Sequence, residues 1–219
     1  MNVHERYIKF HKGTTTVGIV CRDGLILGAD TRVTSGLYIA HKRGKKIFII
    51  TPQIVLSIAG VLADAQALID ILRFNIRIHE FKSNRRVTAK EAARLLSFIM
   101  FQNRLFPLYA EILIGGLNGD GNFALYRLDP LGSLVEDKYA STGSGSPIAY
   151  GVLESEYKSD ISVKEGKELV IKALISAMKR DIGSGNDIDV IIVTKEGAYE
   201  MSKEEKEKYI KEFRQEISG

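Results

Sequence analysis

A glycine–threonine pair, Gly13 and Thr14, opens the stretch GTTTVGIV and could support hydrolytic chemistry. If the peptide bond between the two residues is cut, Thr14 carries both a hydroxyl group and a free α-amine. Because an α-amine has a pKa of about 8, against about 10.4 for lysine, a useful fraction of it is unprotonated at neutral pH. The amine then takes the hydroxyl proton, directly or through one water molecule, and the hydroxyl becomes a nucleophile. A glycine before the cut, having no Cβ, lets the backbone reach the turn that such an attack needs.

Composition alone favours a simpler interpretation of residues 14–16. These threonines are typical of a plain β-strand, because β-branched residues suit a pleated backbone. Asp30 and Lys46, taken alone, are typical of a surface ion pair. Three further polar residues have equally ordinary interpretations as turn serines and a helix-end carboxylate: Ser144, Ser184 and Asp181.

Length and composition indicate an ordinary globular chain. It has 219 residues, of which 45% are hydrophobic and 26% charged. Its longest apolar runs, such as 95–101, are far shorter than the roughly 20 residues that span a bilayer. The leader, residues 1–13, lacks the apolar segment of a secretory signal. We therefore expect a cytoplasmic protein.

The cysteine, histidine and charge content argues against several kinds of site. The single cysteine, Cys21, excludes an internal disulfide and is expected to be an inert buried thiol. The four histidines lack metal-ligand spacing, so no metal site is predicted. The net charge is only +4 and the basic residues are scattered, which gives no indication of nucleic-acid binding.

Hydrophobic periodicity predicts groups of strands separated by helix pairs. Strands are predicted at 15–20, 25–29, 46–50, 54–59, 112–117, 123–128, 138–140, 188–194 and 199–201. Helices are predicted over 62–82, from 88 to about 104, from 146 to about 157, and from 162 onward. Capping-box patterns open the second and fourth of these helices, Thr88 with Glu91 and Ser162 with Glu165. Ser146 is the predicted N-cap of the third, with Pro147 at its first position. The mixture of Lys and Glu over 203–214 predicts a solvated helical face.

This order predicts antiparallel sheets with helices stacked outside them, rather than alternating βαβ units. Two sheets packed face to face, each covered by a helix pair, bury both faces of each sheet. That arrangement explains why residues 190–193 are apolar at every position. With no linker or low-complexity segment, residues 14–219 are predicted to form one α+β domain.

Six stretches of the sequence occur together in the order typical of one family. They are GTTTVGI, GLILGADTRVT, GKKIF, SIAG, YASTGSGSPIAYGVLESEY and KRDIGSGNDIDV. Together they make the chain resemble the catalytic β-subunits of archaeal proteasomes, which are threonine peptidases of the N-terminal-nucleophile hydrolase class. The resemblance runs from about residue 13 to residue 201 and implies a four-layer αββα sandwich.

The resemblance also implies a role for each candidate residue. Thr14 is the N-terminal nucleophile once residues 1–13 are removed as a propeptide, by autocatalytic cleavage of the Gly13–Thr14 bond. Lys46 lowers the pKa of the amine and hydroxyl of Thr14, and Asp30 holds Lys46 charged and oriented. The resemblance assigns the rest of the hydrogen-bond network to Ser144, Asp181 and Ser184, and the oxyanion hole to the backbone N–H of Gly60.

The same resemblance assigns substrate binding to a further group of residues. The pocket for the side chain before the cut is lined by Val33, Gly44, Ile58 and Leu62. All are uncharged, which implies cleavage after hydrophobic residues. The main chain of Thr34 aligns the substrate as an extra strand.

The implied activity is that of a threonine endopeptidase that degrades unfolded proteins inside a barrel. Homo- or hetero-heptameric β-rings stack between rings of α-subunits, and a regulatory ATPase feeds in unfolded chains. No metal, organic cofactor, nucleic acid or membrane is implied. One alternative is a non-catalytic structural β-subunit that keeps its leader and builds the ring for an active paralogue. Another, a small-molecule amidase, has little support, because the sequence contains no recognisable enclosed amide pocket.

Overall fold

The structure, a computed structural model, describes residues 13–36 and 38–218, with side chains up to Lys211. The predicted propeptide, residues 1–13, therefore lies outside the described residues except for Gly13. Within them, no helix is both long and apolar enough to cross a membrane.

The first sheet brings the N-terminal strands beside the last strands of the chain. Its order is β10–β1–β2–β11–β12, with β1 (Thr16–Cys21), β2 (Gly24–Asp30), β10 (Tyr139–Thr142), β11 (Ile188–Thr194) and β12 (Gly197–Glu200). The antiparallel register pairs Thr16 with Ala29 in β1 and β2, and Asp30 with Ile188 in β2 and β11. The end of β2 therefore lies beside the beginnings of β1 and β11.

The second sheet comes from the middle of the chain. Its order is β5–β6–β7–β8–β9, with β5 (Ile47–Thr51), β6 (Ile54–Gly60), β7 (Ala110–Leu117), β8 (Phe123–Leu128) and β9 (Leu134–Asp137). A separate hairpin joins β3 (Val33–Ser35) to β4 (Tyr38–His41). Each predicted strand is present, with ends within about two residues of the prediction.

The described residues form five helices, α2 (Leu62–Ser83), α3 (Ala89–Gln102), α4 (Ser146–Glu156), α5 (Val163–Arg180) and α6 (Lys203–Ser218). Both predicted capping boxes are confirmed. Thr88 and Glu91 at α3, and Ser162 and Glu165 at α5, each satisfy the other's backbone N–H. These reciprocal bonds fix where α3 and α5 begin.

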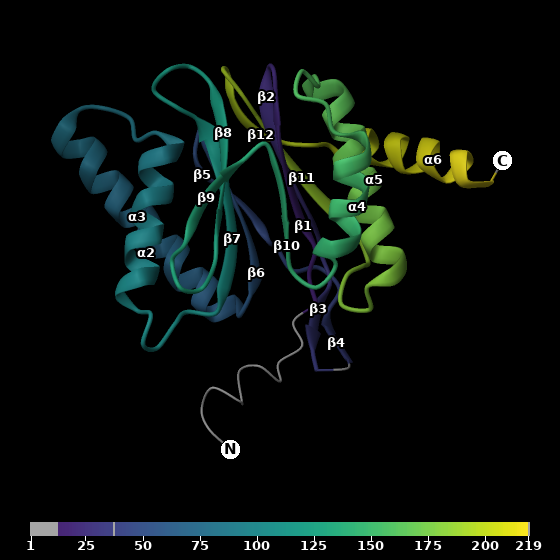
Figure 1. Cartoon of the computed structure of the whole chain (residues 1–219), viewed down its shortest axis with the longest axis horizontal. Coiled ribbons are helices and arrows are strands. Elements are labelled where there is room, and N and C mark those ends of the chain that lie inside the picture. Colours follow the sequence, from purple (N-terminus) through teal and green to yellow (C-terminus); the bar gives the residue numbers. More distant parts are fainter. Residues whose placement is uncertain (1–12, 37, 219) are drawn as a thin grey trace.

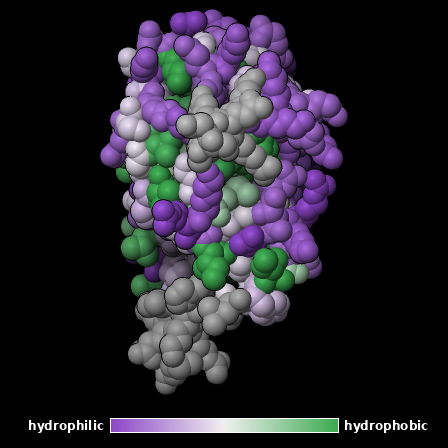
Figure 2. Space-filling model, turned by 90° about the vertical axis from the view of Figure 1, so that its right-hand side faces the viewer, coloured by the Kyte–Doolittle hydropathy of each residue, from purple (hydrophilic) through white to green (hydrophobic). Residues whose placement is uncertain are grey.

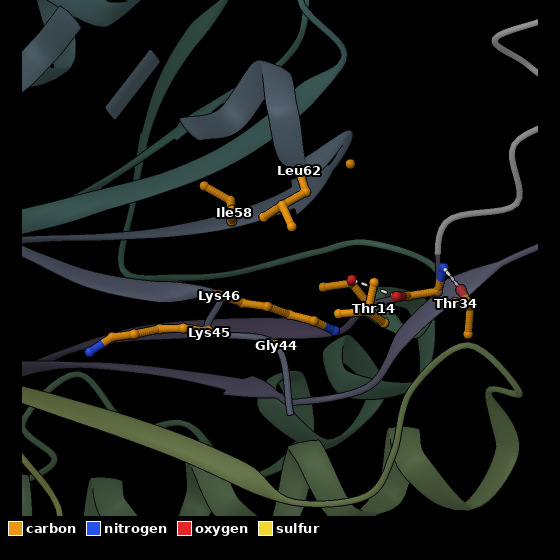
Figure 3. Close-up of a pocket in the computed structure, with 10 residues that line it drawn as sticks. Thr14, Thr34, Gly44, Lys45, Lys46, Ile58 and Leu62 are labelled. Carbon is orange, nitrogen blue, oxygen red and sulfur yellow. Dashed lines mark hydrogen bonds between the residues drawn. The ribbon is translucent and has the colours of Figure 1, made fainter. Parts of the chain in front are cut away.

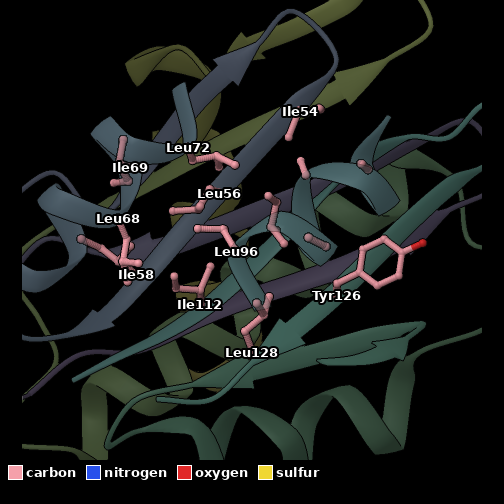
Figure 4. Packing of buried hydrophobic residues seen from close by; sticks show 14 of the residues in the cluster. Ile54, Leu56, Ile58, Leu68, Ile69, Leu72, Leu96, Ile112, Tyr126 and Leu128 are labelled. Carbon is pink, nitrogen blue, oxygen red and sulfur yellow. The ribbon is translucent and has the colours of Figure 1, made fainter. Parts of the chain in front are cut away.

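The elements stack in four layers, as Figure 1 shows: α2 with α3, the two sheets, and α4 with α5. Three buried apolar clusters fill the spaces between the layers. Figure 4 shows the one beneath α2 and α3, where Leu68 and Leu72 meet Leu56 and Ile112. The predicted αββα sandwich, with two antiparallel sheets covered by helix pairs, is confirmed.

The prediction for the start of α4 is wrong in one detail. Gly145, not Ser146, is the N-cap residue, no side chain caps the helix, and Pro147 is its second residue. The chain makes a tight turn here, because Ser146 N donates to Gly143 O at 3.1 Å. The turn leaves Ser144 outside the helix, where it contacts Asp181.

Three short strands were missing from the sequence prediction. β3 and β4 flank Gly36, which has a left-handed φ of +59°, and β9 forms the edge of the second sheet. The β-branched and aromatic residues around Gly36 are the signal that would have revealed this hairpin.

The C-terminal helix was predicted to be solvated, which holds for only part of it. Lys206 is buried, and Tyr209 and Ile210 pack against the cluster beneath α4 and α5. Their spacing places the three side chains on one helical face. Figure 2, which views the molecule from the side of α4, α5 and α6, shows a mainly hydrophilic surface.

The packing of α2 predicts a sharp contrast between two of its residues. Leu72→Ala should lower the free energy of unfolding by about 2–5 kcal/mol, because Leu72 is fully buried and its loss leaves a cavity. Phe81→Ala, on the same helix, should change it by less than about 0.5 kcal/mol, since Phe81 is 90% exposed. Urea unfolding of the isolated chain measures both; equal losses would contradict the assigned core.

Candidate functional site

Thr14 lies just before β1, with its hydroxyl directed at the preceding peptide bond. Its Oγ1 donates to the carbonyl oxygen of Gly13 at 2.6 Å, and its backbone N–H donates to Ser144 Oγ at 3.2 Å. Gly13 also crosses close to Gly183: a Cβ built on Gly13 would lie 2.0 Å from the Cα of Gly183. Neither position has room for a side chain, which is a packing reason for the glycine before Thr14.

Asp30 and Lys46 form a buried ion pair rather than the surface pair that composition suggested. Lys46 Nζ donates to Asp30 Oδ1 at 2.8 Å, and the two side chains are 6% and 0% exposed. Three backbone N–H groups complete the surroundings of the carboxylate. Thr15 donates to Oδ1 at 2.8 Å, while Arg32 and Gly185 donate to Oδ2 at 3.0 and 2.9 Å. Both carboxylate oxygens are thus fully used as acceptors.

The pKa of Lys46 is set by opposing effects. Burial lowers it below the ordinary value of 10.5, and the charge and hydrogen bond of Asp30 offset part of that shift. Asp181 also raises the pKa of Lys46, whereas Arg32 lowers it. Figure 3 shows the Lys46 side chain extending toward Thr14, where its ammonium can act on the hydroxyl.

Asp181 connects the two serines predicted to belong to the site. Ser144 Oγ and Ser184 Oγ each donate to Asp181 Oδ2 at 2.6 Å. Since Ser184 gives its only proton to the carboxylate, the 2.7 Å contact between Thr15 Oγ1 and Ser184 Oγ has Thr15 as the donor. A continuous chain of hydrogen bonds therefore runs from the backbone N–H of Thr14 through Ser144 and Asp181 to Thr15.

One pocket gathers the remaining predicted residues (Figure 3). It is lined by Gly13, Thr14, Val33, Thr34, Gly44, Lys45, Lys46, Ile58, Gly60 and Leu62. Every residue that the sequence assigned to substrate binding or to the oxyanion hole is among them. Figure 3 shows Ile58 and Leu62 on the wall opposite Lys46. The pocket thus offers an apolar wall beside the Thr14 hydroxyl.

Backbone geometry explains the two pocket glycines in different ways. Gly60 has a φ of +126°, which L-residues rarely adopt, and a Cβ there would lie 2.3 Å from Tyr109 O. At Gly44 a Cβ would lie 2.3 Å from Val33 Cγ2. A larger residue at Gly44 would therefore displace part of the pocket wall.

Thr15 and Lys45 belong to the site but were not predicted. Thr15 joins Asp30 to Ser184 through its N–H and its hydroxyl. Lys45 lines the pocket, and its ammonium pairs with Glu200 at 2.6 Å on the exposed side. The triple threonine is the only local signal for Thr15, and nothing local identifies Glu200 as the partner of Lys45.

Cys21 is not a reactive thiol, and the described residues include no cluster of metal-ligating side chains. Burial raises the pKa of the Cys21 thiol to about 12, with the charges of Asp23 and Glu165 adding to the shift, so the thiol stays protonated. In the part of the chain that the structure describes, no three His, Cys, Asp or Glu side chains are placed to hold a metal ion together.

Comparison with known proteins gives matches over most of the chain. The family model described as "Proteasome subunit" matches residues 10–193. "Proteasome subunit beta" of Archaeoglobus profundus is 43% identical over 207 residues, 94% of this chain and 96% of the relative. The protein of the same name from Methanocaldococcus vulcanius is 46% identical over 195 residues, 89% and 87% of the two chains. "Proteasome subunit beta 2" of Thermofilum pendens is 44% identical over 186 residues, 85% and 91%.

The fold and these matches agree with the resemblance seen in the sequence. The four-layer αββα sandwich is the N-terminal-nucleophile hydrolase fold that the resemblance implied. The chain belongs to the proteasome subunit family, and its relatives are β-subunits of archaeal proteasomes. The roles of the individual residues remain predictions.

The buried ion pair predicts a clear difference between adjacent lysines. Lys46→Met should lower the free energy of unfolding by roughly 3–5 kcal/mol at pH 7, because it leaves the Asp30 charge buried without its cation. Lys45→Met should change it by less than about 1 kcal/mol, since Lys45 and Glu200 are both more than half exposed. Adding Asp30→Asn to Lys46→Met should restore part of the loss in urea unfolding. A double variant no more stable than Lys46→Met would contradict the coupling.

Proposed function

We propose that this chain is a threonine-type endopeptidase of the proteasome core particle, activated by cleavage of its own Gly13–Thr14 bond. One observation carries the proposal: the Thr14 hydroxyl lies 2.6 Å from the carbonyl oxygen of the bond to be cut. It does so in a pocket that also holds the buried Lys46. Charge that develops on the hydroxyl oxygen is stabilised by that nearby ammonium.

Self-cleavage proceeds by transfer of the Gly13 acyl group from nitrogen to oxygen. Thr14 Oγ1 attacks the Gly13 carbonyl carbon, the C–N bond breaks, and the hydroxyl proton ends on the departing nitrogen. Water then hydrolyses the ester, which releases the Gly13 carboxylate and leaves Thr14 with a free hydroxyl and a free α-amine. Ser144, which accepts from the Thr14 N–H in the uncut chain, is placed to accept from the new amine.

Peptide hydrolysis uses the same groups in a second role. The α-amine of Thr14 takes the hydroxyl proton as the oxygen attacks a substrate carbonyl, and it returns a proton to the departing amine. Water then releases the acyl group. Lys46 lowers the pKa of both groups on Thr14, and Asp30 keeps Lys46 charged and oriented. Ser144, Asp181 and Ser184 hold the amine through their chain of hydrogen bonds.

Substrate recognition rests on the apolar pocket beside Thr14. Val33, Gly44, Ile58 and Leu62 surround the side chain before the cut and favour hydrophobic residues there. The N–H of Gly60 stabilises the oxyanion, and the main chain of Thr34 pairs with the extended substrate.

The proposed assembly follows from the family. Seven β-subunits, identical or of two types, form a ring, and two such rings lie between rings of α-subunits. A regulatory ATPase delivers unfolded proteins to the enclosed sites. Neither a metal nor an organic cofactor takes part in the proposed reaction.

A structural β-subunit that keeps its leader is the competing function. Relatives named "Proteasome subunit beta 2", from Thermofilum pendens and Pyrobaculum neutrophilum, are 44% and 42% identical to this chain. A numbered name fits an organism with more than one β type. The buried site around Lys46 favours the active form, because a purely structural subunit has no need for a buried ion pair beside Thr14.

The N-terminus of the assembled chain distinguishes the two functions. After co-assembly with its α-subunit partner, the wild-type chain should have the intact mass of a polypeptide that begins at Thr14. Thr14→Ala should keep the leader and lose peptide hydrolysis while rings still form, because no hydroxyl remains to attack. Thr14→Ser, which keeps the hydroxyl, should still be cleaved. Full-length wild-type chain in assembled particles would favour the structural subunit.

The environment of Lys46 predicts a bell-shaped pH profile for hydrolysis. The rate should rise with pH at values below about 8, the ordinary pKa of an α-amine, because the nearby Lys46 cation lowers the pKa of the Thr14 amine. As the pH rises further, the rate should fall again, and this fall should begin below pH 10.5, the ordinary lysine pKa. Burial lowers the pKa of Lys46, so its cation is lost earlier than that of a free lysine. Turnover of a peptide with a hydrophobic residue before the cut, followed across this range, measures both limbs. A rate that still climbs at pH 10.5 would exclude the Lys46 cation from the mechanism.

A further inference from the structure

Asp187 joins the segments that carry the candidate catalytic groups. It ends the loop that contains Asp181 and Ser184. Its backbone N–H donates to Thr31 Oγ1 at 3.1 Å, and Thr31 N donates to Asp187 O at 3.0 Å. Thr31 follows Asp30 directly, so these two bonds link the loop to the strand end that holds the buried carboxylate.

The side chain of Asp187 reaches the segment before Lys46. Asp187 Oδ2 pairs with Arg43 Nη2 at 2.9 Å, and Arg43 lies three residues before Lys46. Gly44 N in turn donates to Thr31 O at 2.8 Å. The three segments that carry Asp30, Lys46 and Ser184 therefore converge on Asp187 and Thr31.

A buried lysine from α6 reaches the same place. Lys206 is only 9% exposed, and its ammonium donates to the carbonyl oxygen of Ile188. The ammonium lies 3.9 Å from Asp187 Oδ1 and 3.6 Å from Asp189 Oδ1. Ile188 is the residue of β11 paired with Asp30 of β2. Lys206 thus fixes the strand position that lies directly beside Asp30.

A second contact of α6 separates attachment of the helix from positioning of the site. Glu205 Oε1 pairs with Lys167 Nζ of α5 at 2.7 Å. This ion pair attaches α6 to another helix and involves neither the 181–187 loop nor β11. Substitution of Glu205 therefore weakens attachment of α6 and leaves the contacts of Lys206 in place.

We propose that Lys206 is a positioning residue of the hydrolytic site, acting through Asp187 and Ile188 on Asp30 and Ser184. α6 lies beyond residues 10–193, the part matched by the family model. A segment outside the family match thereby holds residues at the centre of the site. The expected effect of Lys206 on hydrolysis rests on the proposed function. Its expected effect on the positions of Asp30 and Ser184 does not depend on activity.

Hydrogen exchange tests the structural part in the full-length chain. Lys206→Met should speed amide exchange over residues 184–188 by about tenfold, because the start of β11 loses its anchor. Glu205→Gln should leave exchange there within about twofold. If Lys206→Met does not fold, Asp187→Asn removes the carboxylate charge that faces Lys206 and Arg43, and it should speed exchange over the same residues. Unchanged exchange in a folded Lys206→Met or Asp187→Asn variant overturns the proposal.

Steady-state hydrolysis by the chain assembled with its α-subunit partner tests the effect on the site. Lys206→Met should lower kcat by roughly tenfold and leave KM within about twofold, because misplaced reacting groups slow the chemical steps. Glu205→Gln should change neither value by more than about twofold. Equal losses of kcat in the two variants would mean that Lys206 only helps to attach α6, and would overturn its role as a positioning residue. A wild-type chain without hydrolysis would contradict the proposed function alone, and the exchange comparison would still decide the role of Lys206.

Discussion

The buried carboxylate of Asp30 is the group on which the rest of the site depends. Its four donors come from the residue before β1, the segment before β5, the loop before β11 and the segment just after β2. A carboxylate removed from water needs all its acceptor positions filled, or its burial is costly. Any displacement of one segment therefore leaves the charge incompletely paired, and the four segments are held in register together.

A second constraint is the crossing of two backbones at Gly13 and Gly183. Their close approach sets where Thr14 enters the sheet, and it directs the Thr14 hydroxyl back toward the bond before it. Under the proposed function, the uncut chain thus already holds its nucleophile against the first bond to be cleaved. Lys46 and the hydrogen bonds of Ser144 then serve self-cleavage and peptide hydrolysis in turn.

The polar network occupies one end of an otherwise apolar sandwich. Three apolar clusters separate the four layers and supply the stability that a buried ion pair does not. The sheets can therefore hold Asp30 and Lys46 rigidly at their ends. α6 adds a cation, Lys206, at the same end, from a part of the chain that the family model does not match.

The sequence by itself determined the strands other than β3, β4 and β9, the helix pairs and the start of α3 and α5, because these depend on local periodicity and on residues three apart. With the resemblance, it also identified Thr14, Asp30 and Lys46 as candidates. Only the tertiary structure decided which residues meet. The link from Thr15 to Ser184, the crossing of Gly13 over Gly183 and the contact of Lys206 with Ile188 join residues distant in the chain. Such contacts follow from sheet register and layer packing, which no local pattern encodes.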